Sequence, residues 1–134
     1  MKQEHKELII KHKIFKAKET IKDAEIAIKN QRYNNAMNRI YYAIFHIISA
    51  LSVKYDFSTS KHKQLMGWFN KNFIYTNKID TKLYKIYSKA FSNRQESDYE
   101  DFVTFLEEEV EEHFKDMLYF VSEIEKFINS PNEF

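Results

Sequence analysis

The chain of 134 residues contains no cysteine, one glycine and one proline. Without cysteine there is neither a disulfide framework nor a thiolate zinc site, which is compatible with the reducing cytoplasm. With so little glycine and proline there are few positions for tight turns, which argues against a many-stranded sheet and favours long helices with short connections. The length is that of one domain, so we expect a single helical domain over residues 1–134.

Long apolar runs are also missing. The longest, residues 41–53, is too short to span a bilayer and contains His46. The first ten residues contain acidic side chains and an apolar stretch of only three residues, which does not fit a signal peptide. We therefore expect an intracellular, cytoplasmic protein that does not enter a membrane.

Apolar residues recur at alternating spacings of four and three in two N-terminal segments, which places them on one face of a helix. Ala36, Ala43 and Ala50, seven residues apart, form a seam of small side chains that lets a second helix approach closely. The two apolar faces consist of Ile10, Ile14, Ala17, Ile21, Ala24 and Ile28, and of Met37, Tyr41, Ile44, Ile48, Leu51 and Tyr55.

Three further helices are expected in the C-terminal half. A short one covers about residues 61–74, and the next covers about residues 80–93. The last begins near Thr104, whose hydroxyl can cap it while Glu107 completes a capping box, and it stops near Pro131. The sequence thus predicts an all-α fold, an antiparallel up-and-down bundle of four long helices and one short helix.

Charge is distributed unevenly, although the net charge is only +1. Residues 1–53 carry ten basic and five acidic side chains, residues 54–94 nine and two, and residues 95–134 two and thirteen. Either basic and acidic faces pair within the bundle, or the middle segment forms a basic groove for a nucleic-acid backbone or a nucleotide. Interleaved aromatic residues favour the groove, although aromatic residues at helical spacing more often belong to a core. The lysines are Lys61, Lys63, Lys71, Lys78, Lys82, Lys85 and Lys89, and the aromatic residues are Trp68, Phe73, Tyr75, Tyr84 and Tyr87.

The second predicted helix carries a polar stripe along an otherwise apolar surface. Its members, Asn35, Arg39, Tyr42, His46 and Ser49, follow the helical spacing of four and three. The stripe must therefore meet solvent, a polar cavity or a second subunit. Arg39 and His46 stand two turns apart and can both reach one anion, with His46 titrating near neutral pH.

Arg94 stands in the acidic stretch "SNRQESDYED", which is predicted to form a polar connection after the fourth helix. One interpretation is an exposed loop whose charges are solvated. The other is a guanidinium that grips a phosphate with two hydrogen bonds and stabilises developing charge. In that case Asp98 and Tyr99 are the candidates for proton handling.

Three stretches, "RYNNAMNRIYYAIFHIISALS", "KHKQLMGWFNKNF" and "NRQESDY", resemble the HEPN superfamily of higher eukaryotes and prokaryotes nucleotide-binding proteins. The likeness is to small prokaryotic members with an R-x-x-x-D-Y element. It implies a helical bundle that forms a homodimer and, as in many members, a metal-independent ribonuclease that acts as a toxin or in phage defence. The most specific pieces are Arg39 with Tyr41-Tyr42-Ala43, His62 between Lys61 and Lys63, and Arg94 with Asp98-Tyr99.

The resemblance also implies which residues form the site, with no metal or cofactor. Active members carry a histidine that is separated from the motif arginine by four to six residues, and at those three positions this chain has Tyr99, Glu100 and Asp101. Two functions remain open. One is an RNA-directed toxin or phage-defence effector, a metal-independent endoribonuclease with a composite cleft at a dimer interface. The other is a non-catalytic module that binds a nucleotide, RNA or a protein such as a nucleotidyltransferase-like antitoxin. The candidate catalytic residues are Arg94, Asp98 and Tyr99, and the candidate substrate-binding residues are Arg39, Tyr42, His46, His62, Lys61 and Lys63.

Overall fold

A computed structural model describes residues 2–98 and 104–131. In this part of the chain all the regular secondary structure is helical. The all-α fold predicted from the sequence, with four long helices and one short one, is confirmed. The elements are α1 (Gln3–Lys29), α2 (Tyr33–Lys54), α3 (His62–Phe69), the short π-helix η1 (Asn70–Ile74), α4 (Thr81–Ser97) and α5 (Glu107–Asn129).

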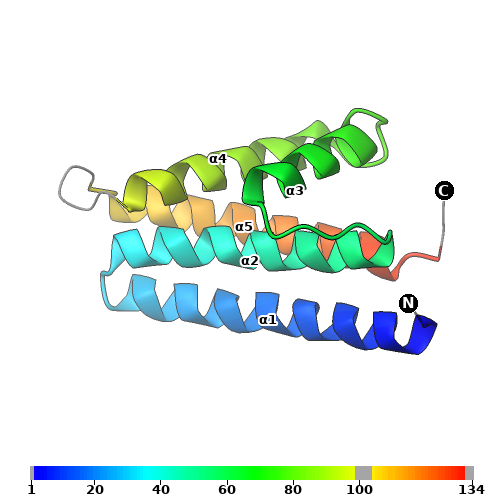
Figure 1. Cartoon of the computed structure of the whole chain (residues 1–134). Helices are drawn as coiled ribbons and strands as arrows, with labels where there is room; N and C mark the ends of the chain where they lie inside the picture. The colour runs from blue at the N-terminus through cyan, green and yellow to red at the C-terminus, as the bar shows by residue number, and fades with distance from the viewer. Residues whose placement is uncertain (1, 99–103, 132–134) are drawn as a thin grey trace.

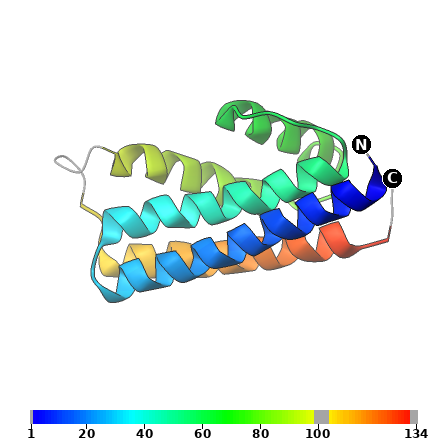
Figure 2. The same cartoon turned by 60° about the horizontal axis from the view of Figure 1, so that its bottom comes forward.

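The four long helices run in alternating directions, and α2 lies in the middle (Figures 1 and 2). It packs against α1 along its length and also contacts α4, α5 and the short α3. The beginning of α1 and the end of α5 lie at one end of the bundle. The α1–α2 connection and the end of α4 lie at the other end.

Small side chains explain how closely α1 and α2 approach. Ala36, Ala43 and Ala50 of α2 are completely buried, as the predicted seam requires. The facing residues of α1 are small as well, and three buried alanines, Ala17, Ala24 and Ala27, lie on its inner face. Alanine costs almost no side-chain entropy on burial and lets the two backbones approach closely, while Ile10, Ile14, Ile21 and Ile28 of α1 also pack against the core.

A cluster of aromatic rings forms the core between α3, α4 and α5. Phe69, Tyr87 and Phe120 are all fully buried. Their ring centroids lie 5.7 Å apart for Phe69 and Tyr87, 5.9 Å for Tyr87 and Phe120, and 6.1 Å for Phe69 and Phe120. These are the separations that aromatic pairs prefer, so the cluster ties three helices together.

Truncation of this cluster is expected to destabilise the whole bundle. Phe120→Ala should lower the free energy of unfolding by about 3–5 kcal/mol, because it removes buried apolar surface and leaves a cavity. Denaturant titration followed by circular dichroism measures the loss. Leu118→Ala on the same helix is the control, since Leu118 is 40% exposed. Equal losses in the two variants would contradict this account of the core.

The predicted start of the last helix is wrong by three residues. The structure begins α5 at Glu107, with Leu106 as the extended residue before it. The backbone N–H of Leu106 donates to the Glu109 carboxylate at 3.0 Å, so Glu109 and not Glu107 closes the first turn. Phe105 is buried against the bundle, which holds the chain extended through Thr104 and delays the helix.

The predicted end of the fourth helix is also wrong. The structure continues α4 to Ser97, so Arg94 lies in a helical turn and not in a connection. The Ser97 hydroxyl donates to the Arg94 carbonyl at 2.7 Å, which satisfies one of the free carbonyl groups at the helix end. No glycine or proline interrupts the segment. This difference matters because a helix fixes the direction of the Arg94 side chain.

The short helix predicted near residues 61–74 is present but changes its winding. After Phe69 it continues as a π-helix, in which the Tyr75 N–H donates to the Asn70 carbonyl at 2.8 Å. The wider turn leaves both Phe73 and Ile74 buried. None of the described helices combines the length with the apolar character that crossing a bilayer requires.

Candidate functional site

The last turn of α4 directs the Arg94 side chain toward α2. Its Nη2 donates to the Tyr42 hydroxyl at 3.4 Å. The guanidinium carbon lies 5.6 Å from the Tyr42 ring centroid and 5.8 Å from that of Tyr41. Asp98, one turn further along α4, places a carboxylate oxygen 3.9 Å from Arg94 Nε, which is too far for a hydrogen bond. Two aromatic rings therefore position the guanidinium, while its nearest carboxylate stays at a distance.

One N–H group of Arg94 has no acceptor. The Nε atom is buried and makes no hydrogen bond to any residue that the structure describes. Buried polar atoms normally have a partner, and a guanidinium carries five N–H donors in one plane. The Nε atom itself is shielded, but the Arg94 side chain is 25% exposed, so the rest of the guanidinium can still be reached by a ligand.

Arg39 of α2 approaches the same tyrosine ring. Its guanidinium carbon lies 5.2 Å from the Tyr42 centroid. Its Nε and Nη2 both donate to the Asn38 side-chain oxygen, at 3.2 and 2.7 Å. Asn38 is neutral, so it orients Arg39 without compensating the charge. Two guanidinium groups beside one ring repel each other, and a bound anion would relieve that repulsion.

His62, the first residue of α3, packs against three aromatic rings of α2, those of Tyr41, Tyr42 and Phe45. Its Nδ1 is 2.7 Å from the Tyr41 hydroxyl, and its ring stacks on Phe45 with centroids 4.4 Å apart. Burial, followed by the charge of Arg94, lowers the pKa of His62, whereas burial raises the pKa of Tyr41 well above its ordinary value. At neutral pH the phenol is protonated and can donate to Nδ1, and in that tautomer the imidazole proton sits on Nε2. His62 is thus a neutral hydrogen-bond donor.

His46 behaves differently from the prediction. Burial, and then the charges of Lys16, Lys13 and Arg39, lower its pKa to about 4. The expectation that His46 titrates near neutral pH is therefore wrong, because the bundle buries the imidazole and α1 places two lysines beside it. Its ring centroid lies 6.2 Å from that of Tyr42, at the edge of the cluster around Arg94.

The lowered pKa of His46 makes stability depend on pH. In the unfolded chain the group titrates near 6.5, so between about pH 6.5 and 4 the unfolded state binds a proton that the native state does not. Its contribution is present above pH 6.5 and is lost as the pH falls toward 4. His46→Gln should reduce the stability loss over that interval by roughly 1–2 kcal/mol, after allowance for screening by water. The midpoint of urea unfolding, measured as a function of pH, reports this loss of stability, and His5→Gln is the control at an exposed histidine. If His46→Gln has the same pH dependence as the wild type, the lowered pKa of His46 is contradicted.

Five of the predicted site residues come together in the structure. Around the Tyr42 ring lie Arg39 and Arg94, with Asp98 next to Arg94 and His62 5.7 Å from Tyr42 between ring centroids. Of the other predicted site residues, Lys61 and Lys63 are exposed on either side of His62. His46 lies at the edge of the group, with its ring centroid 6.2 Å from that of Tyr42. Tyr99 falls outside the described residues.

Three residues of the site were not assigned to it from the sequence. Tyr41 and Phe45 hold the His62 ring, and Asn38 holds Arg39. The position of Asn38 next to Arg39 in the sequence is only a weak indication of this hydrogen bond. Nothing in the sequence links Tyr41 to His62, because the path of residues 55–61 decides that contact.

The predicted basic groove is only partly supported. Phe73 and Tyr87 belong to the core, so a base-stacking role for them is wrong, whereas Tyr75 is 84% exposed. Lys18 of α1 pairs with Glu125 of α5 at 3.0 Å, so some of the charge asymmetry reflects pairing between helices. All seven predicted lysines are nevertheless exposed: Lys61, Lys63, Lys71, Lys78, Lys82, Lys85 and Lys89.

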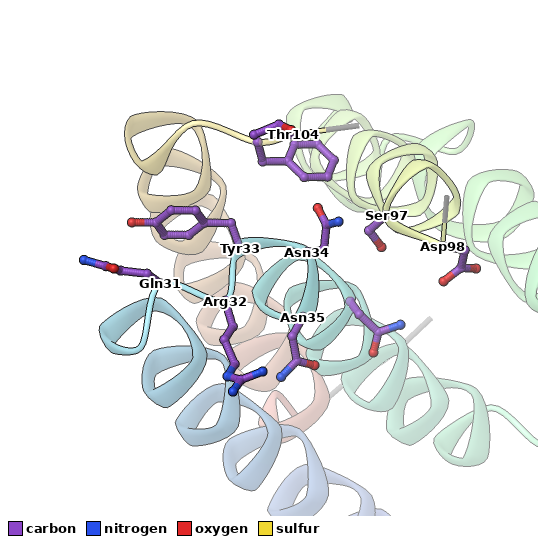
Figure 3. Close-up of a pocket in the computed structure, with 10 residues that line it drawn as sticks. Gln31, Arg32, Tyr33, Asn34, Asn35, Ser97, Asp98 and Thr104 are labelled. Atoms are coloured by element: carbon purple, nitrogen blue, oxygen red, sulfur yellow. The ribbon is translucent and has the colours of Figure 1, made fainter. Parts of the chain in front are cut away.

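A polar pocket of about 650 Å³ adjoins the residues around Arg94, at the end of the bundle where α1 meets α2 (Figure 3). The Asn34 amide of α2 and the Ser97 hydroxyl of α4 point into the space between the two helices. Asp98 lines the pocket, and its carboxylate also lies 3.9 Å from Arg94 Nε. The pocket is lined by Gln31, Arg32, Tyr33, Asn34, Asn35, Asn38, Ser97, Asp98, Thr104 and Phe105.

A smaller hollow of about 460 Å³ lies between α1 and α2. Arg32 and Asn35 line both hollows, and Arg39 lines the smaller one. The polar pocket therefore borders the Arg94 cluster through Asp98 and borders Arg39 through the smaller hollow. No group of three His, Asp or Glu side chains within residues 2–98 and 104–131 is arranged to hold a metal ion.

Comparison with known proteins identifies the family. The HEPN domain matches residues 10–127, so the chain belongs to the HEPN family. A Thermotoga maritima protein named "UPF0332 protein" is 39% identical over 123 residues, 92% of this chain and 93% of the relative. Two proteins of Methanocaldococcus jannaschii are also similar. "Putative toxin MJ0142" is 29% identical over 119 residues (89% of this chain, 81% of the relative), and "Putative toxin MJ0605" is 32% identical over 83 residues (62% of each chain).

Proposed function

We propose that this protein is a HEPN effector of the toxin or phage-defence kind that binds the phosphate backbone of RNA at Arg94 and Arg39 and cleaves it without a metal ion. The observation that carries the proposal is that two guanidinium groups, those of Arg94 and Arg39, lie on the same Tyr42 ring, with the Arg94 side chain still 25% exposed. Planar guanidinium groups fit phosphate oxygens with two hydrogen bonds. The toxin names of two relatives support this class of activity.

In the proposed reaction the 2′-hydroxyl of RNA attacks the adjacent phosphorus. The O2′–P bond forms, the P–O5′ bond breaks, the proton of O2′ passes to a base, and water supplies a proton to O5′. Arg94 and Arg39 stabilise the extra charge on the non-bridging oxygens. His62 donates a hydrogen bond through Nε2 to the same phosphate. Asp98 is the carboxylate closest to Arg94 and is assigned to receive the O2′ proton.

We further propose that the working form is a homodimer with the two sites facing one cleft. Arg39, Tyr42 and His46 lie on an outer face of the central helix and are only half-buried. A second copy on that face would cover the stripe and bring two Arg94 side chains to one substrate. An antitoxin of acidic character would instead engage the exposed Lys61 and Lys63 beside His62.

The direct test is RNA binding and cleavage by the purified protein in the presence of EDTA. Cleavage should persist with EDTA, and the logarithm of the affinity should fall with the logarithm of salt concentration with a slope of about −0.7 for each phosphate contacted. Fluorescence anisotropy with a labelled single-stranded RNA measures the slope. Absence of binding at low salt, or binding indifferent to salt, would contradict a phosphate-directed site.

A non-catalytic role as a binding module is the second candidate. It is favoured by the lowered pKa values of His46 and His62, which leave no imidazolium in the cluster at neutral pH to protonate a leaving group. Salt-dependent binding of RNA without cleavage would support this role over the ribonuclease.

A further inference from the structure

We propose that the polar pocket at the α1–α2 end of the bundle is a base-binding subsite for the RNA whose phosphate lies at Arg94. This inference rests on the proposed function, since it assigns the pocket to the same RNA. The pocket shares Asp98 with the Arg94 cluster. It also shares Asn38, whose side-chain oxygen accepts two hydrogen bonds from Arg39. A base in the pocket would therefore belong to a nucleotide next to the gripped phosphate.

The lining of the pocket suits a base better than a second phosphate. Side-chain amides dominate it, from Asn34, Asn35 and Asn38 of α2 and from Gln31 before it. An amide presents a donor beside an acceptor, which is the pattern that reads the edges of unpaired bases. The lining also contains the acidic Asp98, at the end of α4, and the basic Arg32, so these two charges together do not favour a second phosphate.

Asp98 also indicates which bases are preferred. A carboxylate only accepts hydrogen bonds, so it favours an exocyclic amino group and disfavours a carbonyl oxygen. Adenine and cytosine present an amino group next to a ring nitrogen that accepts. Uracil presents a carbonyl oxygen in place of the amino group and an N–H donor in place of the accepting ring nitrogen. The pocket should therefore prefer adenine or cytosine to uracil.

The test compares the binding of labelled oligo(A), oligo(C) and oligo(U) RNA of equal length by fluorescence anisotropy at one low salt concentration. The wild-type protein should bind oligo(A) or oligo(C) about tenfold more tightly than oligo(U). Asp98→Asn should bring this ratio close to one, because an amide donates as well as accepts and no longer disfavours a carbonyl oxygen. Asn34→Ala should weaken the binding of oligo(A) and oligo(C) without changing the salt slope, since it removes an amide of the pocket and no phosphate contact. Asn129→Ala, an exposed asparagine at the end of α5, is the matched control and should keep the ratio.

The outcomes separate the subsite from the proposed function. If the wild-type protein binds none of the three RNAs, the proposed function fails and the subsite fails with it. If the wild type binds RNA without a base preference, or Asp98→Asn retains the preference, only the subsite is overturned. Asn35→Ala is the second variant, because Asn35 is exposed and its truncation leaves the packing intact. Folding of each variant is checked by circular dichroism.

Discussion

Replacement of Arg94 by alanine is expected to abolish RNA cleavage, and with it any growth arrest on induced expression, while the fold stays intact. Alanine removes the positive charge and every guanidinium hydrogen bond, and the loss of one such stabilising group typically costs a factor of 10²–10³ in rate. Arg94→Lys should recover only part of the activity, because an ammonium cannot present a planar fork to phosphate. Cleavage of a labelled RNA and growth curves measure both effects.

The fold should survive because Arg94 contributes little to stability. Its side chain is 25% exposed, and its ion pair with Asp98 spans 3.9 Å with the Asp98 side chain 52% exposed, so the pair is weak. Lys126→Ala is the control, since it also removes a basic residue with an acidic neighbour on the same helix. A collapse of the melting temperature in Arg94→Ala alone would show that Arg94 is structural and would favour the binding module.

Asp98→Asn separates two roles of the neighbouring carboxylate. If Asp98 receives the proton of the 2′-hydroxyl, the amide variant should lose cleavage but retain RNA affinity. If Asp98 only orients Arg94, the amide still offers an oxygen to Nε and part of the cleavage should remain. The ratio of cleavage to binding distinguishes the two.

Replacement of His62 by alanine is expected to reduce RNA affinity and cleavage by about 10- to 100-fold. The expected loss is that of one hydrogen bond from Nε2 to a charged phosphate, about 1.5–3 kcal/mol. Because burial and Arg94 lower the pKa of His62 below its ordinary value of about 6.5, the group is neutral from pH 7 to 9. The ratio of wild-type to His62→Ala activity should therefore be constant between pH 7 and pH 9.

Two comparisons make the His62 experiment decisive. His12→Ala changes an exposed histidine of α1 and should have no effect. Tyr41→Phe keeps the stacked ring but removes the hydroxyl that fixes Nδ1, so it should cause a smaller loss than His62→Ala. A wild-type activity that falls above pH 7 only when His62 is present would show that His62 acts as an acid, contrary to the proposal.

The helical periodicity was sufficient to predict the bundle. Spacings of four and three residues identify a helix by themselves, and alanines seven residues apart identify a close contact, because both follow from local geometry. Element ends were less predictable. The chain stays extended through Thr104 because Phe105 is buried, and α4 continues through Arg94 because nothing interrupts it.

The sequence by itself therefore determined the all-helical fold, the place of Arg39 and Tyr42 on a polar stripe, and the chemical suitability of Arg94 for phosphate. Only the tertiary structure decided that Arg39 and Arg94 meet on one tyrosine ring and that His62 joins them through Tyr41. The physical reason is that these residues lie on different helices. Their distances, and the burial that sets the pKa values of His46 and His62, depend on how α1, α3 and α4 pack against α2.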